Sequence, residues 1–220
     1  MHPPRVYLDT TIFKFSATRL PRYFPREQTI DWGGRVQTIT VYDDGFLNPN
    51  DAITNNPELK AEAELLLSIA SLAKNGRIHC VVQFETQFEL WGLPKTDSTE
   101  GRFYGAPVRR VNAPFEYGRV VFAAGERAKD SQLDFLVSLT DERFLELQRI
   151  TGGYQGPKKV QRNQVLDAFH LWCAEHNGCD FFLSLDFKLQ KVVARSRKKP
   201  QLSIVRPSEL LAAAALQTTG

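Results

Sequence analysis

The sequence predicts an α/β fold with three layers, in which a central, mainly parallel β-sheet lies between two sets of helices. Short apolar runs alternate with longer segments of helical periodicity along most of the chain, and this alternation is typical of a parallel sheet covered by helices on both faces. The composition, 42% hydrophobic and 24% charged, is that of a globular protein with a core. A chain of 220 residues suits one large domain, so we expect a single domain over residues 1–220.

Five short apolar runs are expected to form strands, because they are rich in β-branched or aromatic residues. They are RVYLD (5–9), RIHCVVQ (77–83), LDFLVS (133–138), DFFLSLD (180–186) and LSIV (202–205). Six segments are expected to form helices: 57–76, 84–92, 140–150, 161–178, 187–196 and 207–216. Residues typical of helix ends support four of these helices: Gly76, Thr140, Gly178 and Pro207.

Two segments do not follow the alternation of strands and helices, and we interpret both as insertions on the single domain. The first covers about 18–56, where Gly33-Gly34 can close a small β-hairpin. The second covers about 93–131 and is rich in arginine and aromatic residues. The sequence therefore predicts a core domain with inserted segments that form small β-hairpins.

The net charge, the number of cysteines and the lengths of the apolar segments disfavour several classes of protein. The net charge of +3 is too small to indicate a nucleic-acid binder by itself. The three cysteines are an odd number and no two stand at metal-ligand spacing, so a reducing interior is expected. No apolar stretch approaches the length of a membrane span, and Asp9 interrupts the N-terminal apolar run that a signal peptide would need. We expect a cytoplasmic protein that does not enter a membrane.

Acidic residues follow the predicted strands in several distant parts of the chain. Asp9 ends the first strand, Glu85 and Glu89 follow the second, and Asp186 ends the FFLSL strand. Asp167 lies in the first half of the helix 161–178. In a parallel sheet, ligands bind beyond the carboxyl ends of the strands. We therefore expect these carboxylates to meet at one edge of the sheet.

Carboxylates gathered in this way would repel one another, and a divalent cation would relieve the repulsion. Mg²⁺ and Mn²⁺ prefer oxygen ligands and need only a few carboxylates. A bound ion can polarise a phosphodiester and lower the pKa of an attacking water. For each acid alone, the simpler interpretation is an ordinary turn or N-cap residue. For His170, one turn after Asp167, we favour a partly buried histidine over a metal ligand.

The motifs around these acids resemble those of the PIN-domain family. The family opens with a strand, Asp and then Thr or Ser, as in VYLDTTIF. Its second acid lies on the helix after the next strand, as in VVQFETQFEL, and its third in a helix similar to QVLDAFHLWCA. It closes with a strand ending in Ser/Thr-x-Asp, as in FFLSLDF, and with a segment similar to PSELL. The match covers about 1–17, 57–92 and 133–216.

The resemblance implies a metal-dependent ribonuclease. The fold of this family is found in toxins of bacterial toxin–antitoxin modules. Four acids would be catalytic and would hold one or two Mg²⁺ or Mn²⁺ ions: Asp9, Glu89, Asp167 and Asp186. Glu85 is the alternative second acid. Three hydroxyl side chains would orient the ligands or a metal-bound water: Thr10, Thr11 and Ser184. The partners implied are RNA and a cognate antitoxin protein, and a homodimer is left open.

Basic residues near the predicted edge are candidates for contact with RNA phosphates. They are Lys158, Lys159, Arg162, Lys188, Arg109 and Arg110. Runs of Lys and Arg are more often solvated surface than a dedicated groove, so both interpretations stay open.

Two other functions are weighed against the ribonuclease. A PIN-like module without catalysis would bind RNA or a protein, but all four acids are present. A phosphatase of the haloacid-dehalogenase type also begins with a strand-end Asp. That enzyme needs a second Asp two positions later, where this chain has Thr11.

Overall fold

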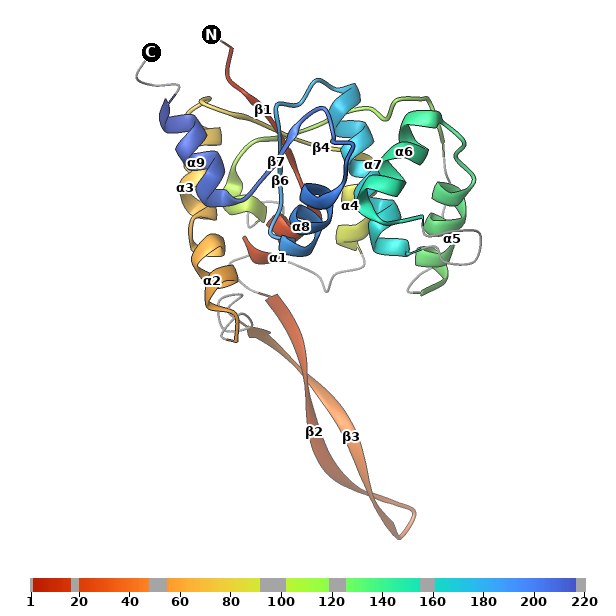
Figure 1. Ribbon diagram of the computed structural model, residues 1–220. Helices are drawn as coiled ribbons and strands as arrows, with labels where there is room; N and C mark the ends of the chain where they lie inside the picture. The colour runs from red at the N-terminus through yellow and green to blue at the C-terminus, as the bar shows by residue number, and fades with distance from the viewer. Residues whose placement is uncertain are drawn as a thin grey trace.

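The protein has an α/β fold with a five-stranded, all-parallel central sheet flanked by helices (Figure 1). The computed structural model describes residues 2–16, 20–47, 55–91, 102–118, 126–154 and 161–216. The order of the strands is β5-β4-β1-β6-β7. Their bounds are Arg5–Leu8 (β1), His79–Val82 (β4), Val108–Arg110 (β5), Phe181–Leu183 (β6) and Ser203–Val205 (β7). The three-layer α/β/α fold expected from the sequence is confirmed.

Helices cover the two faces of the sheet in separate groups. The first group is α1 (Thr10–Phe15), α2 (Pro57–Glu64), α3 (Leu66–Lys74) and α9 (Pro207–Leu216). The second group is α5 (Glu126–Val137), α6 (Glu142–Thr151), α7 (Arg162–His176) and α8 (Phe187–Arg195). Helix α4 (Phe84–Trp91) follows β4, and a short 3-10 helix, η2, spans Arg102–Gly105. Figure 1 shows α2, α3 and α9 on one side of the sheet and α5, α6 and α7 on the other.

The alternation of side chains along β1 explains why the core has two parts. Val6 and Leu8 point into the first core, whereas Tyr7 points into the second. Successive residues of a strand face opposite sides of the sheet, and both sides are covered here. All three side chains are fully buried, as expected for the central strand of a parallel sheet.

The expected strand at 133–138 is wrong, because these residues belong to helix α5 and the turn after it. Gln132 and Leu136, one helical turn apart, are both fully buried, and Leu136 packs in the core with α7. A short apolar run carries too little periodicity to separate a buried strand from a buried helix. The other four strands and the helix at 140–150 are confirmed.

Three further details differ from the expectation. The helix expected at 57–76 is two helices, which meet at Leu65. Helix α1 was not expected. It begins directly after Asp9. Strand β5 lies inside the segment 93–131 that we interpreted as an insertion, yet it pairs with β4 at the edge of the central sheet.

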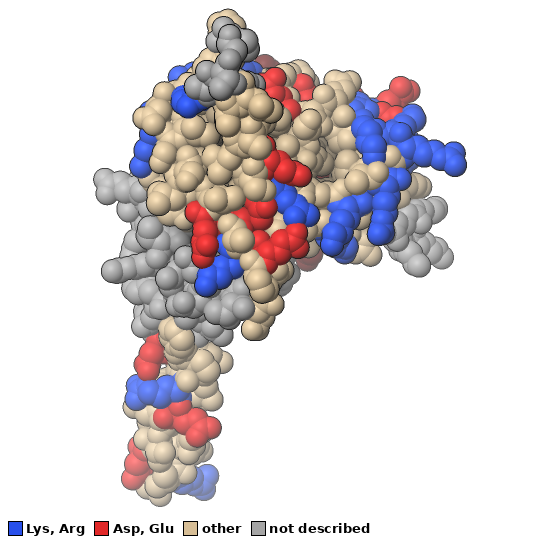
Figure 2. Space-filling view, turned by 60° about the vertical axis from the view of Figure 1, so that its left-hand side comes forward, with Lys and Arg blue, Asp and Glu red and all other residues tan. Residues whose placement is uncertain are grey.

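The segment 18–56 contains the expected hairpin, whose strands are longer than the small hairpin we predicted. Strands β2 (Leu20–Trp32) and β3 (Arg35–Leu47) pair in antiparallel fashion over 13 residues each. Gly33 and Gly34 form the turn with φ of 63° and 83°, which suits the left-handed two-residue turns of hairpins. Figure 1 shows the hairpin extending away from the sheet, and Figure 2 shows side chains of both charge signs along it.

The cysteines and the helices can be compared with the sequence expectations in the part of the chain that the structure describes. Cys80, Cys173 and Cys179 are buried and form no disulfide. None of the described helices has both the length and the apolar character needed to cross a membrane.

Candidate functional site

Asp9 lies at the carboxyl end of the central strand, where β1 meets α1. Its backbone is extended, as is usual for the residue before a helix, and its Oδ1 accepts from the N–H of Thr10, the first residue of α1, at 2.7 Å. Its other oxygen, Oδ2, accepts from Thr11 Oγ1 and from Ser184 Oγ, both at 2.6 Å. Asp9 is 6% exposed. Burial raises the pKa of its carboxyl group, and the two hydroxyl donors oppose that rise.

Ser184 connects Asp9 to the next acid of the site. The hydroxyl of Ser184 donates to Asp9 and accepts from the backbone N–H of Asp186 at 2.9 Å. Asp186 in turn caps helix α8, because its Oδ1 accepts from the N–H groups of Lys188 and Leu189. Strand β6 pairs directly with β1. The two strand-end aspartates are therefore held by neighbouring strands of the sheet.

Glu89 reaches the same place from helix α4. Its Oε2 accepts from Thr10 Oγ1 at 3.1 Å, and its Oε1 lies 2.6 Å from Nε2 of His170. The other ring nitrogen of His170 lies 3.0 Å from the hydroxyl of Tyr7. His170 is buried, and burial opposes its positive charge. The charge of Glu89 and its hydrogen bond outweigh burial, so the pKa of His170 is raised. Glu89 and His170 thus form a largely buried pair, which is an ion pair when His170 is protonated.

Asp167, on the second turn of α7, differs from the other acids of the site in its contacts. Its side chain makes no hydrogen bond or ion pair with any residue in the described part of the chain. Its pKa is raised well above the usual range, first by burial and then by the charges of Asp9, Asp186 and Glu89. Lys188 opposes the rise. These interactions place all four predicted acids close enough to influence one carboxyl group.

Glu85 lies one turn before Glu89 but belongs to a different network. It is fully buried and accepts from Gln132 Nε2 at 2.7 Å and from the Tyr117 hydroxyl at 3.1 Å. The main charges that raise the pKa of Asp167 include Glu89 and do not include Glu85. The structure therefore brings Glu89, and not Glu85, together with the three aspartates.

A pocket of about 310 Å³ opens beside the acids. Its lining includes two acids, Asp167 and Asp186, and two bases, Arg162 and Lys188. Arg162 is the first residue of α7, and its Nη2 donates to Gln132 Oε1 at 2.8 Å. Its buried Nε has no hydrogen-bond partner among the described residues. The pocket thus combines carboxylates with cationic groups that could bind an anion.

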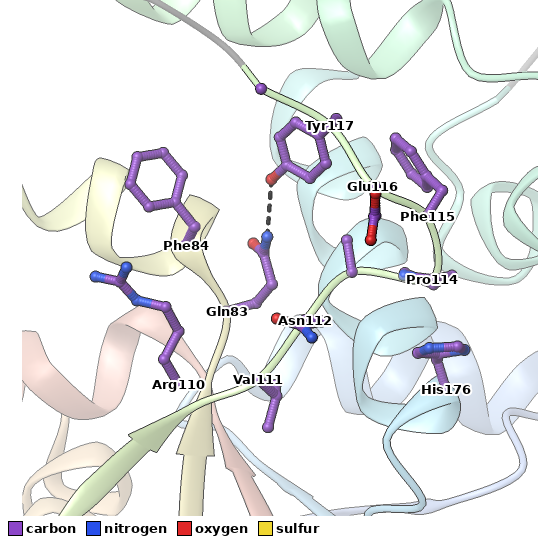
Figure 3. A pocket seen from close by; sticks show the side chains of 12 residues that line it. Gln83, Phe84, Arg110, Val111, Asn112, Pro114, Phe115, Glu116, Tyr117 and His176 are labelled. Carbon is purple, nitrogen blue, oxygen red and sulfur yellow. Dashed lines mark hydrogen bonds between the residues drawn. The ribbon is translucent and has the colours of Figure 1, made fainter.

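The remaining basic candidates lie elsewhere. Lys158 and Lys159 fall outside the described residues. Arg109 and Arg110 are exposed on β5. Arg110 lines a larger pocket of about 880 Å³, where its guanidinium lies 5.6 Å from the centre of the Phe84 ring (Figure 3).

Figure 3 also shows Gln83 of this larger pocket pointing to Tyr117, to which it donates at 2.7 Å. None of the four clustered acids lines this pocket. The structure brings Arg162 and Lys188 to the acids and places Arg109 and Arg110 on a separate edge of the sheet.

Oxygen ligands of this kind fit a hard divalent cation. Within the described residues, however, no three His, Cys, Asp or Glu side chains are already arranged to hold an ion. Both oxygens of Asp9 and of Glu89 accept hydrogen bonds from neighbouring groups. Each carboxylate oxygen has more than one lone pair, so a bound ion would share these oxygens with their donors or displace the donors.

Two residues of the site were not recognised from the sequence as parts of it. We expected His170 to be an ordinary histidine, but it is 1% exposed and paired with Glu89. Its spacing of three residues from Asp167 was a signal, because residues so spaced are neighbours on a helix. Tyr7 carried no such signal, since its contact with His170 joins residues that are distant in the chain.

Comparisons with protein-family models, with curated proteins and with solved structures each gave no match.

Proposed function

We propose that the chain is a metal-dependent endoribonuclease of the PIN type, which hydrolyses RNA phosphodiester bonds. The proposal joins the motif resemblance to the geometry of the acids. Asp9, Glu89, Asp167 and Asp186 would be the catalytic and metal-holding residues, and Mg²⁺ or Mn²⁺ would be the cofactor. A cognate antitoxin and a cytoplasmic location belong to the same proposal.

The observation that supports the proposal most directly is the environment of the Asp167 carboxylate. A half-buried carboxylate with no hydrogen bond to any described residue, surrounded by three other acids, is unfavourable when it is charged. Proteins keep such groups mainly where they serve a function. A divalent cation between Asp167 and its neighbours would compensate the repulsion, and the pocket beside Asp167 and Asp186 gives access from solvent.

Each side chain has a role that follows from its contacts. Asp9 and Asp167 would hold the ion, with Asp186 and Glu89 beside them. Bound at this place, the ion would supply Lewis-acid polarisation of a phosphoryl oxygen and a lowered pKa for an attacking water. Ser184 and Thr11 keep Asp9 oriented.

The groups around the acids have supporting roles. His170 keeps Glu89 oriented, while Thr10 donates to the same carboxylate. Arg162 and Lys188 line the pocket and would bind phosphates of the RNA strand.

The test is cleavage of single-stranded RNA by the purified full chain in Mn²⁺ or Mg²⁺ and in EDTA. We expect cleavage that requires the metal and disappears in Asp9→Asn and Asp167→Asn, with both variants checked for folding by circular dichroism. Asp180→Asn is the matched control, because Asp180 precedes β6 at the opposite edge and accepts from Arg5 N. Equal cleavage by the native chain and Asp9→Asn would refute the proposal.

A second candidate is a PIN-like module that binds RNA or a protein without cleaving RNA. The observation in its favour is that the oxygens of Asp9 and Glu89 are engaged in hydrogen bonds and that no described group is ready to hold an ion. It predicts RNA binding that is unchanged by EDTA, with no cleavage in any metal. The phosphatase is less favoured, because the Thr11 hydroxyl anchors Asp9 and accepts from Leu185 N where a second acid would be needed.

A further inference from the structure

The β2-β3 hairpin has two faces of different chemistry. Directly opposed residues of the two strands share a face, and the face alternates along each strand. One face, called here the apolar face, contains Phe24, Arg26, Gln28, Ile30 and Trp32 of β2 with Arg35, Gln37, Ile39, Val41 and Asp43 of β3. The opposite face carries three threonines, two acids, Pro25, Val36 and Tyr42: the threonines are Thr29, Thr38 and Thr40, and the acids Glu27 and Asp31. Hydrophobic residues occupy five of the ten positions of the apolar face, whereas on the opposite face they are fewer, Val36 and Tyr42 among them.

This apolar face is open to solvent along the described hairpin. Trp32 is 75% exposed, Phe24 39% and Ile39 37%. Figure 1 shows the hairpin extending away from the sheet and helices. A two-stranded hairpin by itself is at best marginally stable in water. Pairing over 13 residues on each strand is thus expected to need a further surface that covers the apolar face.

The charge of the hairpin disfavours nucleic acids and anionic membranes as the surface that covers the apolar face. Residues 20–47 contain three arginines and four acids. Nucleic acids and anionic membranes are bound by clusters of Lys and Arg, and a hairpin with an excess of acids lacks such a cluster. The apolar face itself contains Arg26 and Arg35 against Asp43. A protein surface with the same mixed character is the partner that fits.

We propose that the apolar face binds the apolar face of a second copy of this chain, with the two hairpins antiparallel. A two-fold axis across the ribbon, near Gln28 and Ile39, places β2 on β2 and β3 on β3. Trp32 at one tip then meets Phe24 of the second copy, and Arg35 meets its Asp43. Both ends of the interface gain an aromatic pair and an ion pair.

The opposite arrangement, with both tips at the same end, is less favourable. It brings the Arg35 residues of both copies to one end and the Asp43 residues to the other, so that like charges lie near each other. Asp43 also pairs with Arg26 of its own hairpin at 2.7 Å, and both side chains stay more than half exposed. Asp43 therefore remains accessible to a second arginine. Charge complementarity selects the antiparallel dimer.

The dimension of the ribbon sets the expected strength. The nine residues of each strand that form the apolar face give a length of about 30 Å and a width of about 10 Å, so two faces bury roughly 600 Å² in total. This area is smaller than that of most specific protein interfaces. We infer a weak, concentration-dependent dimer with a dissociation constant of about 1 to 100 µM.

The first test is sedimentation velocity of the full chain over this concentration range. Trp32→Thr is expected to raise the dimer dissociation constant by about tenfold or more, since threonine keeps the strand propensity but removes the indole. Val36→Thr is the matched control on the other face, where Val36 is 71% exposed. It is expected to change the constant by less than about twofold. A native chain that stays monomeric throughout, or a dimer weakened equally by both variants, would overturn the proposal.

A second test addresses the arrangement through charge. Arg35→Glu and Asp43→Lys are each expected to dissociate the homodimer, because each places like charges together. An equimolar mixture of the two variants is expected to restore dimers. The acid introduced at position 35 of one copy then meets the base introduced at position 43 of the other, and the native pair remains at the other end. A mixture that is no more dimeric than either variant alone would exclude this register.

Crosslinking gives an independent check of the two-fold axis. Gln28→Cys lies at the proposed axis, whereas Thr29→Cys lies on the opposite face. The three native cysteines are buried, so a short bismaleimide should react at the new site. Crosslinked dimers of the first variant and not of the second are expected, and the reverse would contradict the proposal. The inference does not rest on the proposed ribonuclease activity, and every readout here is independent of RNA cleavage.

Discussion

The variant Asp167→Asn is expected to stabilise the metal-free protein at neutral pH. Asp167 has no hydrogen-bond partner among the described residues, and its pKa is raised by burial and by the charges of Asp9, Asp186 and Glu89. Asparagine has nearly the same shape and no charge. The substitution removes the unfavourable charge without leaving a cavity.

The size of the effect follows from the linkage between pKa and stability. Each pKa unit corresponds to about 1.4 kcal/mol, and a partly buried carboxyl group beside other acids gives an expected gain of about 1 to 3 kcal/mol at pH 7. For a chain of this length, about 1 kcal/mol changes Tm by about 2 to 4 °C. The folded state binds the extra proton between the ordinary and the raised pKa of Asp167. The penalty is therefore absent below about pH 4 and grows as the pH rises through the raised pKa.

The assay is thermal unfolding of both proteins in EDTA at pH 7 and pH 4, followed by the same measurement at pH 7 with Mn²⁺. In EDTA the variant is expected to have the higher Tm at pH 7 and nearly the same Tm at pH 4. Mn²⁺ is expected to reverse the order, because an ion at about 1,000 times its dissociation constant stabilises the native chain by about 4.1 kcal/mol, which exceeds the gain expected for the variant. The variant lacks one of its ligands.

Asp134→Asn is the control, because Asp134 is exposed on α5. It is expected to leave both Tm values and the response to Mn²⁺ unchanged. If Asp167→Asn lowers Tm in EDTA at pH 7, the account of repulsion among the acids is incorrect. If Mn²⁺ stabilises the native chain and the variant equally, the ion does not bind at these acids.

Three further variants test the surrounding contacts. His170→Gln breaks the pair with Glu89 and is expected to lower the free energy of unfolding by about 3 kcal/mol in urea titrations. Because the pKa of His170 is raised in the folded protein, this loss should be full below the ordinary pKa of histidine and should fade as the pH rises through the raised pKa. Ser184→Ala removes a hydroxyl donor that opposes the rise in the pKa of Asp9. The free energy of unfolding at pH 7 is expected to fall by about 1 to 3 kcal/mol, and an unchanged value would show that this hydrogen bond does not stabilise the fold. Arg162→Gln should weaken RNA binding in fluorescence anisotropy and reduce the slope of log K against log salt by about one, whereas an unchanged slope would remove Arg162 from the RNA contacts.

The sequence predicted the three aspartates of the site because it predicted the elements that carry them. Asp9 and Asp186 follow strands that any parallel sheet would end at the same edge, and Asp167 lies near the start of a helix with clear ends. The choice between Glu85 and Glu89 was beyond the sequence. Both lie on one helix, four residues apart, and only the contacts with Thr10 and His170 separate them.

Two segments were beyond local patterns for other reasons. The run at 133–138 is apolar enough for a strand and too short to reveal its helical period, and its packing against α7 decides that it is a helix. Strand β5 contains two exposed arginines. It lacks the apolar signal of a strand, and it forms because β4 provides hydrogen-bonding groups at the edge of the sheet.

The sequence by itself determined the class of fold, the hairpin closed by Gly33-Gly34 and the carboxylates at the ends of β1 and β6. These features follow from local rules, namely the periodicity of apolar residues and the conformational freedom of glycine. Only the tertiary structure decided that Asp167 has no described partner and that His170 is paired with Glu89. Those properties depend on distances between residues far apart in the chain, and local periodicity contains no information about such distances.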